Sequence, residues 1–250
     1  MKVRRVPPAL TVLAVLVVAW QICTSTGLLN PLFFPPPSVL FLTTCKMARS
    51  GELAGHLEAT LTRLFIGAFS GSVLGLLCGV LMGAAAQLRR LLEPVISALY
   101  SAPKLTLLPM LMLFLGVGET PRILLIAASC FVLMSMHGLD AIRNINSTYI
   151  EMAVNYGAGR AMLVRKVYLP ASLPQIFTGL RVTLGRALVL TVSVELVSSS
   201  SGLGSMIWMS WQTFSTEKLY IGVILSAALG AGIHSVLKRL ESRIVPWRNG

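Results

Sequence analysis

The stretch "LFIGAFSGSVLGLLCGVLMGAAAQL", residues 64–88, contains no Asp, Glu, Lys or Arg. A helix needs about 20 predominantly apolar residues to cross the hydrocarbon core of a bilayer, so this stretch is long enough to do so. The stretch "LYIGVILSAALGAGIHSVL", residues 219–237, also lacks these four residue types. The two stretches predict an all-α, polytopic membrane protein.

The composition of the whole chain agrees with this class. Of its 250 residues 55% are hydrophobic and only 12% are charged, and the mean hydropathy is +0.77. A soluble domain carries roughly 25% charged residues. This chain therefore has too few charges to cover a surface that faces water on all sides.

The net charge of +12 is informative through its distribution. Cations gather before the first apolar run, after the second, after the fourth and at the end of the chain, while the other connections hold only scattered ones. Cytoplasmic loops of membrane proteins carry an excess of Lys and Arg. The pattern predicts about six spans with both termini in the cytoplasm, and it leaves no basic surface that would indicate nucleic-acid binding.

The apolar runs divide the chain into six expected spans within a single domain, 1–250, whose six-helix core covers about 58–240. The spans are expected near 9–23, 61–86, 105–118, 122–140, 179–198 and 219–237. A short external helix is expected over 39–58. Pro109 should bend or break the third span, because proline removes a helix hydrogen bond and clashes with the preceding turn.

Glycines recur every four residues through the second span, at positions 67, 71, 75, 79 and 83. This spacing places them on one face of a helix, where a second helix can approach closely. The pattern favours tight helix packing, with a pore-lining face as the alternative.

The segment "EMAVNYGAGRAMLVRKVYLP", residues 151–170, is polar and basic between two apolar blocks. Thr148 and Glu151 have the spacing of a capping box, which predicts a helix from Tyr149. Gly157 suits a left-handed turn that ends this helix.

A second short helix is expected over 159–167, until Pro170 and Pro174 prevent its continuation. Segment 148–170 is therefore predicted to be a cytoplasmic helix-turn-helix. From its residues alone it could be a connecting loop, a helix lying on the lipid surface or a docking site for a partner.

The segment resembles the signature of permease subunits of ATP-binding-cassette importers: Glu-Ala-Ala, three residues, Gly, nine residues, then Ile-x-Leu-Pro. Glu151, Ala153, Gly157 and Leu169-Pro170 hold their places, whereas Met152 and Val167 replace the central Ala and the Ile. "APKLTLLPMLMLFLGVGE", "SSGLG" and "FPPPSVL" resemble the subgroup that imports nitrate, alkanesulfonates, taurine and related small molecules. The likeness covers nearly the whole chain from about residue 30.

The resemblance implies that the segment is the coupling helix, which docks on a cytoplasmic ATPase subunit. Arg160 and Arg165 would pair with acidic residues of that ATPase. It further implies a bacterial inner-membrane location, a second permease copy as a homodimer, and a solute-binding protein outside. The chain has no Gly-x-x-x-x-Gly-Lys run that would cradle a nucleotide, so no cofactor is expected.

Glu195 is the one acid clearly inside an apolar run. An ionisable residue in a membrane span is costly and indicates function by default. Glu195 is thus a translocation-path candidate, with a bond between helices or a bridge between subunits as alternatives. The histidines and cysteines have no metal-binding spacing, and a Cys23–Cys45 disulfide is open.

Three other functions are alternatives for this sequence. A proton-coupled secondary transporter would use Glu195 as its relay, but neither midplane charge pairs nor an inverted repeat are evident. A membrane enzyme has only the Ser-x-x-Lys spacing in "SAPK" to support it. The third alternative is the same importer role with a pyrimidine-like vitamin precursor as the substrate.

Overall fold

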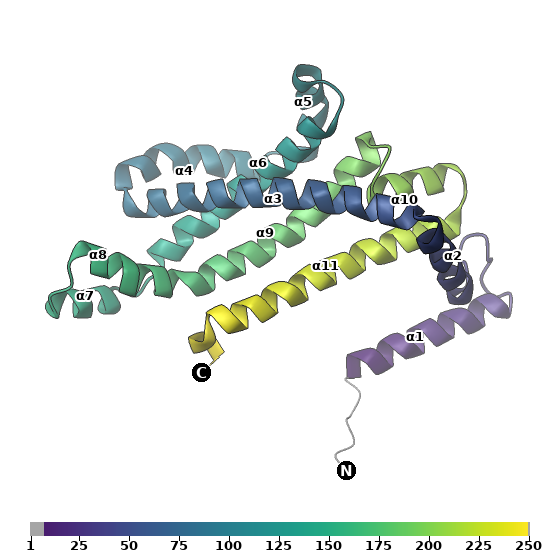
Figure 1. The fold of residues 1–250 in the computed structure, drawn as a ribbon, viewed down its shortest axis with the longest axis horizontal. Coiled ribbons are helices and arrows are strands. Elements are labelled where there is room, and N and C mark those ends of the chain that lie inside the picture. The colour runs from purple at the N-terminus through teal and green to yellow at the C-terminus, as the bar shows by residue number, and fades with distance from the viewer. Residues whose placement is uncertain (1–7, 250) are drawn as a thin grey trace, which may run out of the picture. The chain divides into compact units, whose positions relative to one another are not determined.

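The computed structural model describes residues 8–249, and every regular element in that range is helical (Figure 1). The elements are α1 (Pro8–Ser25), α2 (Pro37–Ser50), α3 (Glu52–Ala84), α4 (Ala86–Ser101), η1 (Lys104–Leu107), α5 (Leu108–Leu115), α6 (Glu119–Arg143), α7 (Ser147–Asn155), α8 (Arg160–Leu163), η2 (Val164–Tyr168), α9 (Leu169–Ser198), α10 (Leu203–Gln212), α11 (Thr216–Ile244) and η3 (Pro246–Asn249). The all-α fold class is confirmed.

The chain forms two compact units. Unit 1 comprises Met1–Ala59 and Glu195–Ser226, and unit 2 comprises Thr60–Val194 and Ala227–Gly250. Unit 2 holds most of the long helices and the polar segment that follows α6.

Three helices in the described range are long and apolar enough to cross a bilayer, namely α3, α6 and α11. α4 and the following segment Lys104–Leu115 make a fourth span if they are counted together, because they are bent by 93° at a short break. α9 is long enough at 30 residues but carries three charged side chains. With the apolar part of α1, these segments account for the six or so spans that the sequence predicts.

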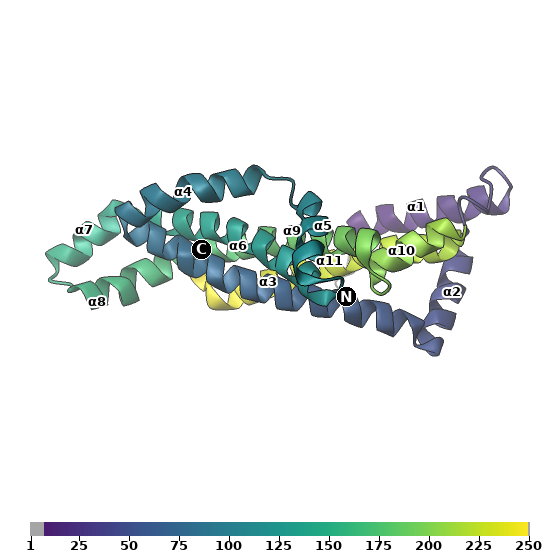
Figure 2. The same ribbon diagram turned by 90° about the horizontal axis from the view of Figure 1, so that it is seen from above.

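Within unit 2 the glycine face of α3 lies directly against α6, and Figure 2 shows the two helices side by side. A Cβ added to Gly71 would lie 2.1 Å from the carbonyl oxygen of Ala127, and one added to Gly79 would lie 2.3 Å from that of Ser135. No side chain fits in so little space, so the interpretation of the glycines as a packing face is confirmed.

Apolar side chains from three helices close the core of unit 2 around this contact. They are Leu64 and Ala68 of α3, Ile126 and Cys130 of α6, and Ala187 and Leu188 of α9. In a membrane such a core is stabilised mainly by van der Waals contacts, since lipid is as apolar as the side chains.

A buried ion cluster joins α3 to the first turn of α6. Glu119 accepts from Nε of Arg63 at 2.5 Å and from its Nη2 at 2.8 Å, and it also accepts from Nη1 of Arg122 at 2.7 Å. The Arg63 side chain is only 3% exposed, whereas that of Glu119 is 52% exposed. No pattern in the sequence indicates that these three residues meet.

The prediction that Pro109 bends or breaks the third span is wrong, because the break in this region lies before the expected span 105–118. The bend lies between Ser101 and Lys104, and Pro109 occupies the first turn of α5. Proline is tolerated there because the first amide groups of a helix have no partner within it.

In unit 1 the expected external helix over 39–58 is two helices. α2 ends at Gly51, whose φ of +79° is the left-handed conformation typical of a helix end, and α3 begins at the next residue. An ion pair of 2.6 Å between Glu52 and Lys218 joins the first turns of α3 and α11. From the sequence, a disulfide between Cys23 and Cys45 is possible. In the structure both are free thiols.

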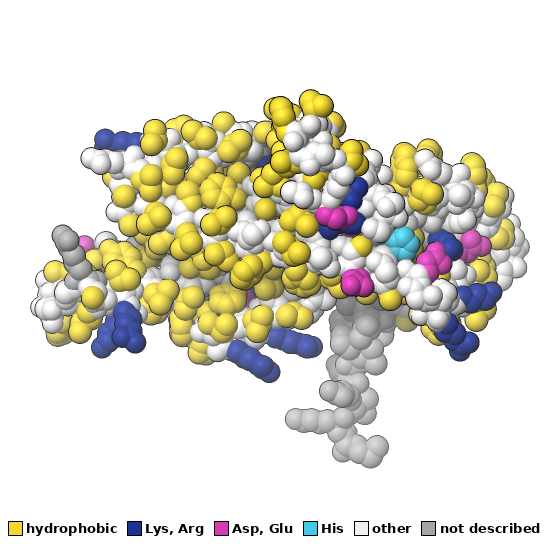
Figure 3. Space-filling view, turned by 45° about the horizontal axis from the view of Figure 1, so that its top comes forward, with side chains coloured by type: hydrophobic (Ala, Val, Ile, Leu, Met, Phe, Trp, Pro, Cys, Tyr) yellow, Lys and Arg dark blue, Asp and Glu magenta, His cyan; other side chains and the backbone are white. Residues whose placement is uncertain are grey.

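Large apolar side chains cover much of the surface, and the face drawn in Figure 3 is mostly hydrophobic. On α3, for example, Phe69 is 73% exposed and Leu74 is 60% exposed. In water such a surface would aggregate, whereas lipid tails solvate it.

Candidate functional site: an elbow after α6 and a buried carboxylate

The polar segment after α6 folds into two short helical arms joined by a turn, residues 147–168, which we call the elbow. α7 is the first arm, and α8 with η2 is the second. Figures 1 and 2 show both arms at one end of unit 2, beyond the end of α6. The predicted helix-turn-helix is present, although both of its arms differ in detail from the expectation.

The first arm begins two residues before the expected start. The side chain of Asn146 accepts a hydrogen bond of 3.0 Å from the amide of Thr148, and α7 starts at Ser147. The capping box predicted for Thr148 and Glu151 is therefore wrong. Since Asn146 caps the helix, Glu151 lies beyond the first turn, and its side chain is exposed.

The turn between the arms is built as predicted. Gly157 has a φ of +79°, and its amide donates to the carbonyl oxygen of Val154 at 2.9 Å. The amide of Ala158 donates to the carbonyl oxygen of Ala153 at 2.9 Å. These two bonds satisfy carbonyls at the end of α7, and the left-handed conformation favours glycine at position 157.

The second arm does not end at Pro170, and this prediction is wrong. η2 is a π-helix, in which the amide of Leu169 donates to the carbonyl oxygen of Val164, five residues earlier. α9 then runs on from Leu169 through Pro170 and Pro174. The wider π turn accommodates a proline that would clash with the preceding turn of a regular α-helix.

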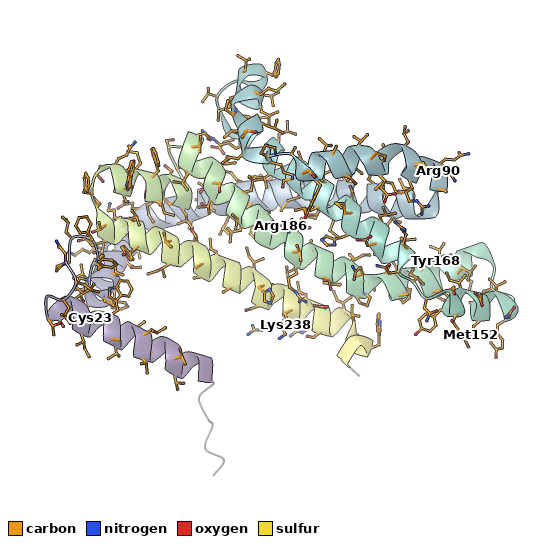
Figure 4. All side chains as sticks on the ribbon, turned by 180° about the vertical axis from the view of Figure 1, so that it is seen from behind. Cys23, Arg90, Met152, Tyr168, Arg186 and Lys238 are labelled. Carbon is orange, nitrogen blue, oxygen red and sulfur yellow. The ribbon has the colours of Figure 1, made fainter. Side chains whose placement is uncertain are left out.

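The elbow exposes apolar side chains together with cations. Tyr149 is 58% exposed, Met152 52% and Tyr156 89%, and Arg165 and Lys166 are exposed beside them. The backbone of Arg160 starts α8, but its side chain lies outside the described residues. Figure 4 labels Met152 and Tyr168, on the first arm and at the end of the second.

A cavity of about 370 Å³ lies where the elbow meets α9. It is lined by Tyr149, Lys166, Val167, Pro170, Ala171 and Trp247. Trp247 belongs to η3, so the last helical turn of the chain reaches the base of the elbow.

Glu195 lies in unit 1, where its carboxylate is fully buried. Its Oε2 accepts from the amide of Gly204 at 3.0 Å, in the first turn of α10. A Cβ added to Gly202, which has a φ of +111°, would lie 2.3 Å from the carboxyl carbon of Glu195. His56 accepts from the amide of Gly202 at 3.2 Å and holds the same loop.

The carboxylate of Glu195 thus lies at the start of a helix, where unpaired amides and the helix dipole favour negative charge. The sequence signal for this arrangement is the pair of glycines in "SSGLG", just before α10. A role for Glu195 in the translocation path remains a prediction.

Sequence reasoning missed the partner of Arg181 in unit 2. Arg181 forms an ion pair with Glu241 of α11, and Glu241 is only 7% exposed. Among the described residues no group of His, Cys, Asp and Glu is placed to hold a metal ion.

Residues 71–246 match the family described as binding-protein-dependent transport system inner membrane component. The chain is 32% identical over 249 residues to the taurine transport system permease protein TauC of Escherichia coli strain K12, which covers 98% of this chain and 90% of that protein. It is 34% identical over 236 residues to the putative aliphatic sulfonates transport permease protein SsuC of Bacillus subtilis strain 168. This match covers 94% of this chain and 86% of that protein.

The fold is also similar to that of a solved chain of the MetNI methionine ABC transporter in an inward-facing conformation. The TM-score is 0.68 at 23% sequence identity, and the match covers 77% of this chain and 95% of that chain.

Proposed function

Because this chain belongs to the family of binding-protein-dependent transport system inner membrane components, it is a permease subunit of an ATP-binding-cassette importer, and we propose that its cargo is a small organic sulfonate. Such a subunit forms the membrane path and catalyses no covalent step, since separate ATPase subunits hydrolyse ATP. The substrate class is supported by the near-full-length similarity to permeases named for taurine and for aliphatic sulfonates. A formylaminopyrimidine permease is less similar, at 25% identity.

The elbow and the first two residues of α9 are proposed as the docking site of the ATPase, with these signature residues: Glu151, Ala153, Gly157, Arg160, Arg165, Leu169 and Pro170. The observation that carries this proposal is the exposure of apolar side chains on two ordered arms. Exposed apolar residues with a polar rim are typical of a surface that binds another protein. Tyr149 and Met152 supply the apolar contact, and Arg165 supplies a charge for an acidic partner.

The local geometry suits mechanical coupling. The second arm continues through η2 into α9 without a flexible linker, so a push on the elbow is transmitted to a membrane helix. Closure of two ATPases around ATP would move two elbows and switch the path from outward to inward opening, as a rigid-body transition between two states.

The proposal also includes the other subunits of the transporter and its place in the membrane. Two copies of this chain form a homodimeric permease in a bacterial inner membrane, with both termini in the cytoplasm. Two ATPases bind inside, and a solute-binding protein delivers the substrate outside.

Substitution of Gly157 tests the docking site. Gly157→Val forces a β-branched residue into the left-handed region at a cost of about 1–2 kcal/mol or more, which should distort the turn. Gly159→Ala is the matched control, because a Cβ there meets nothing within 4 Å and its φ lies outside the left-handed region. We expect Gly157→Val to abolish co-purification of the ATPase while membrane insertion persists, and Gly159→Ala to preserve both.

Unchanged co-purification with Gly157→Val would contradict the docking role.

Uptake in vesicles tests the substrate class and the energy source together, with radiolabelled taurine and methanesulfonate as probes. We expect uptake only with ATP, the ATPase and the binding protein. Uptake by this chain alone under a proton gradient, lost in Glu195→Gln, would instead identify a proton-coupled transporter.

A further inference from the structure

Two cations in unit 2 converge on one aromatic ring. Nη1 of Arg186, on α9, donates to the hydroxyl of Tyr100 at 3.0 Å, and its guanidinium carbon is 5.8 Å from the ring centroid. Nζ of Lys104 is 5.6 Å from the same centroid and donates to the carbonyl oxygen of Tyr100 at 3.0 Å. We call these three residues the Tyr100 cluster.

The cluster has no negative partner in the part of the chain that the structure describes. Neither Arg186 nor Lys104 forms an ion pair with a described carboxylate. The other intramembrane arginines differ in this respect, because Arg181 pairs with Glu241 and Arg63 pairs with Glu119. The Tyr100 cluster therefore keeps an excess of positive charge.

The cluster lies at membrane depth. α9 has 30 residues, about 45 Å at 1.5 Å per residue, and Arg186 lies near its middle, as Figure 4 shows. Tyr100 and Lys104 flank the break between α4 and η1, where the chain bends by 93°. Broken helices at this depth are tolerated where they are buried in protein or line a wet cavity.

The cluster is also open. Arg186 is exposed, Tyr100 is 37% exposed, and a Cβ added to the neighbouring Gly185 meets nothing within 4 Å. An arginine in mid-span that faced lipid would be strongly unfavourable, so intramembrane charges face water or protein instead. The open side of α9 around 185–186 is thus best explained as a water-filled part of the path.

We propose that Arg186, Lys104 and Tyr100 form an anion-binding site on the translocation path that takes the sulfonate group of the substrate. A sulfonate stays ionised at all physiological pH values and offers three acceptor oxygens. Arginine presents five N–H donors in a planar fork that matches an oxyanion, and Lys104 adds a second positive charge. The assignment of a sulfonate, rather than another small oxyanion, rests on the proposed function.

The test uses Gly185→Cys in the full transporter, assembled with its ATPase in nanodiscs. The open space at this position leaves room for a thiol beside Arg186. The probes are two membrane-impermeant methanethiosulfonates, one ending in a sulfonate and the other in a trimethylammonium group. Labelling at position 185 is measured by peptide mass spectrometry, which separates it from the native cysteines.

We expect both reagents to react, the anionic one preferentially. Adding Arg186→Gln should lower the anionic-to-cationic rate ratio about tenfold or more, because one nearby charge acts with opposite sign on the two reagents. Adding Lys238→Gln, which removes an exposed cation elsewhere, should leave the ratio unchanged. Methanesulfonate should slow the anionic labelling, whereas the neutral isostere dimethyl sulfone should not.

The proposal is overturned if position 185 is inaccessible to both reagents, or if Arg186→Gln leaves the rate ratio unchanged. Uptake provides the separate test of the proposed function. If the wild type takes up methanesulfonate but Arg186→Gln leaves the labelling ratio unchanged, the proposed anion site is wrong and the proposed function stands. If labelling depends on Arg186 but no sulfonate is transported, the anion site stands and the proposed cargo is wrong.

Discussion

A carboxylate inside an apolar helix needs hydrogen-bond donors around it, and at Glu195 one donor is the amide of Gly204, in the first turn of α10. Gly202 makes this possible, because its lack of a Cβ leaves the space that the carboxylate occupies. Its φ of +111° is also a conformation that few other residues adopt.

Gly202→Ala should therefore destabilise unit 1 by at least about 2 kcal/mol, through a clash of the new methyl group with Glu195. Gly232→Ala is the control, since a Cβ at that helical position meets nothing within 4 Å. Size-exclusion profiles and unfolding temperatures in detergent measure the effect. Equal stability of the two variants would mean that the loop relaxes away from Glu195.

The carboxylate of Glu119 holds two arginines that are themselves buried. Glu119→Gln removes the charge that both share, so Glu119 would no longer offset the repulsion between the two guanidinium groups. We expect a loss of about 2 kcal/mol, less than for a fully buried pair because Glu119 is half exposed. A lower unfolding temperature that Arg63→Met in the same variant partly restores would confirm that repulsion is the cause.

The contact between α3 and α6 depends on glycines rather than on large side chains. Close approach of two backbones maximises van der Waals contact where no hydrophobic effect operates between helices. The spacing of four residues keeps every glycine of the stripe on the face that meets α6.

Gly71→Leu should separate the two helices, since even a Cβ would lie 2.1 Å from the carbonyl oxygen of Ala127. Gly55→Leu on the same helix is the matched control, because its Cβ has open space. We expect Gly71→Leu to prevent recovery of folded protein from membranes and Gly55→Leu to be tolerated. Similar yields of the two would show that this contact is dispensable.

The distribution of cations along the chain predicts its orientation in the membrane. Alkaline phosphatase is active only outside the cytoplasm, so fusions report the side of each segment. We expect high activity for a fusion after Asn30, and at least about tenfold lower activity for fusions in the elbow after Ala158 and at the C-terminus. High activity at Ala158 would place the elbow outside and exclude an ATPase partner.

Much of this protein follows from local properties of its sequence. Long stretches without charge determine the membrane class, because no other environment solvates them. The four-residue glycine spacing determines the packing face of α3, and the conformational freedom of Gly157 determines the turn of the elbow. Each of these depends on residues close together in the chain.

The details that sequence reasoning got wrong are places where several local structures compete. The details that it missed are contacts between residues far apart in the chain. Asn146 displaced Thr148 as the cap of α7, and a π turn carried α9 through Pro170, because several local solutions were available. Tyr100 and Arg186 are 86 residues apart and meet only because the fold of unit 2 brings the end of α4 near the middle of α9. Which side chains meet across such distances is decided by how the helices approach each other, and that is a property of the tertiary structure alone.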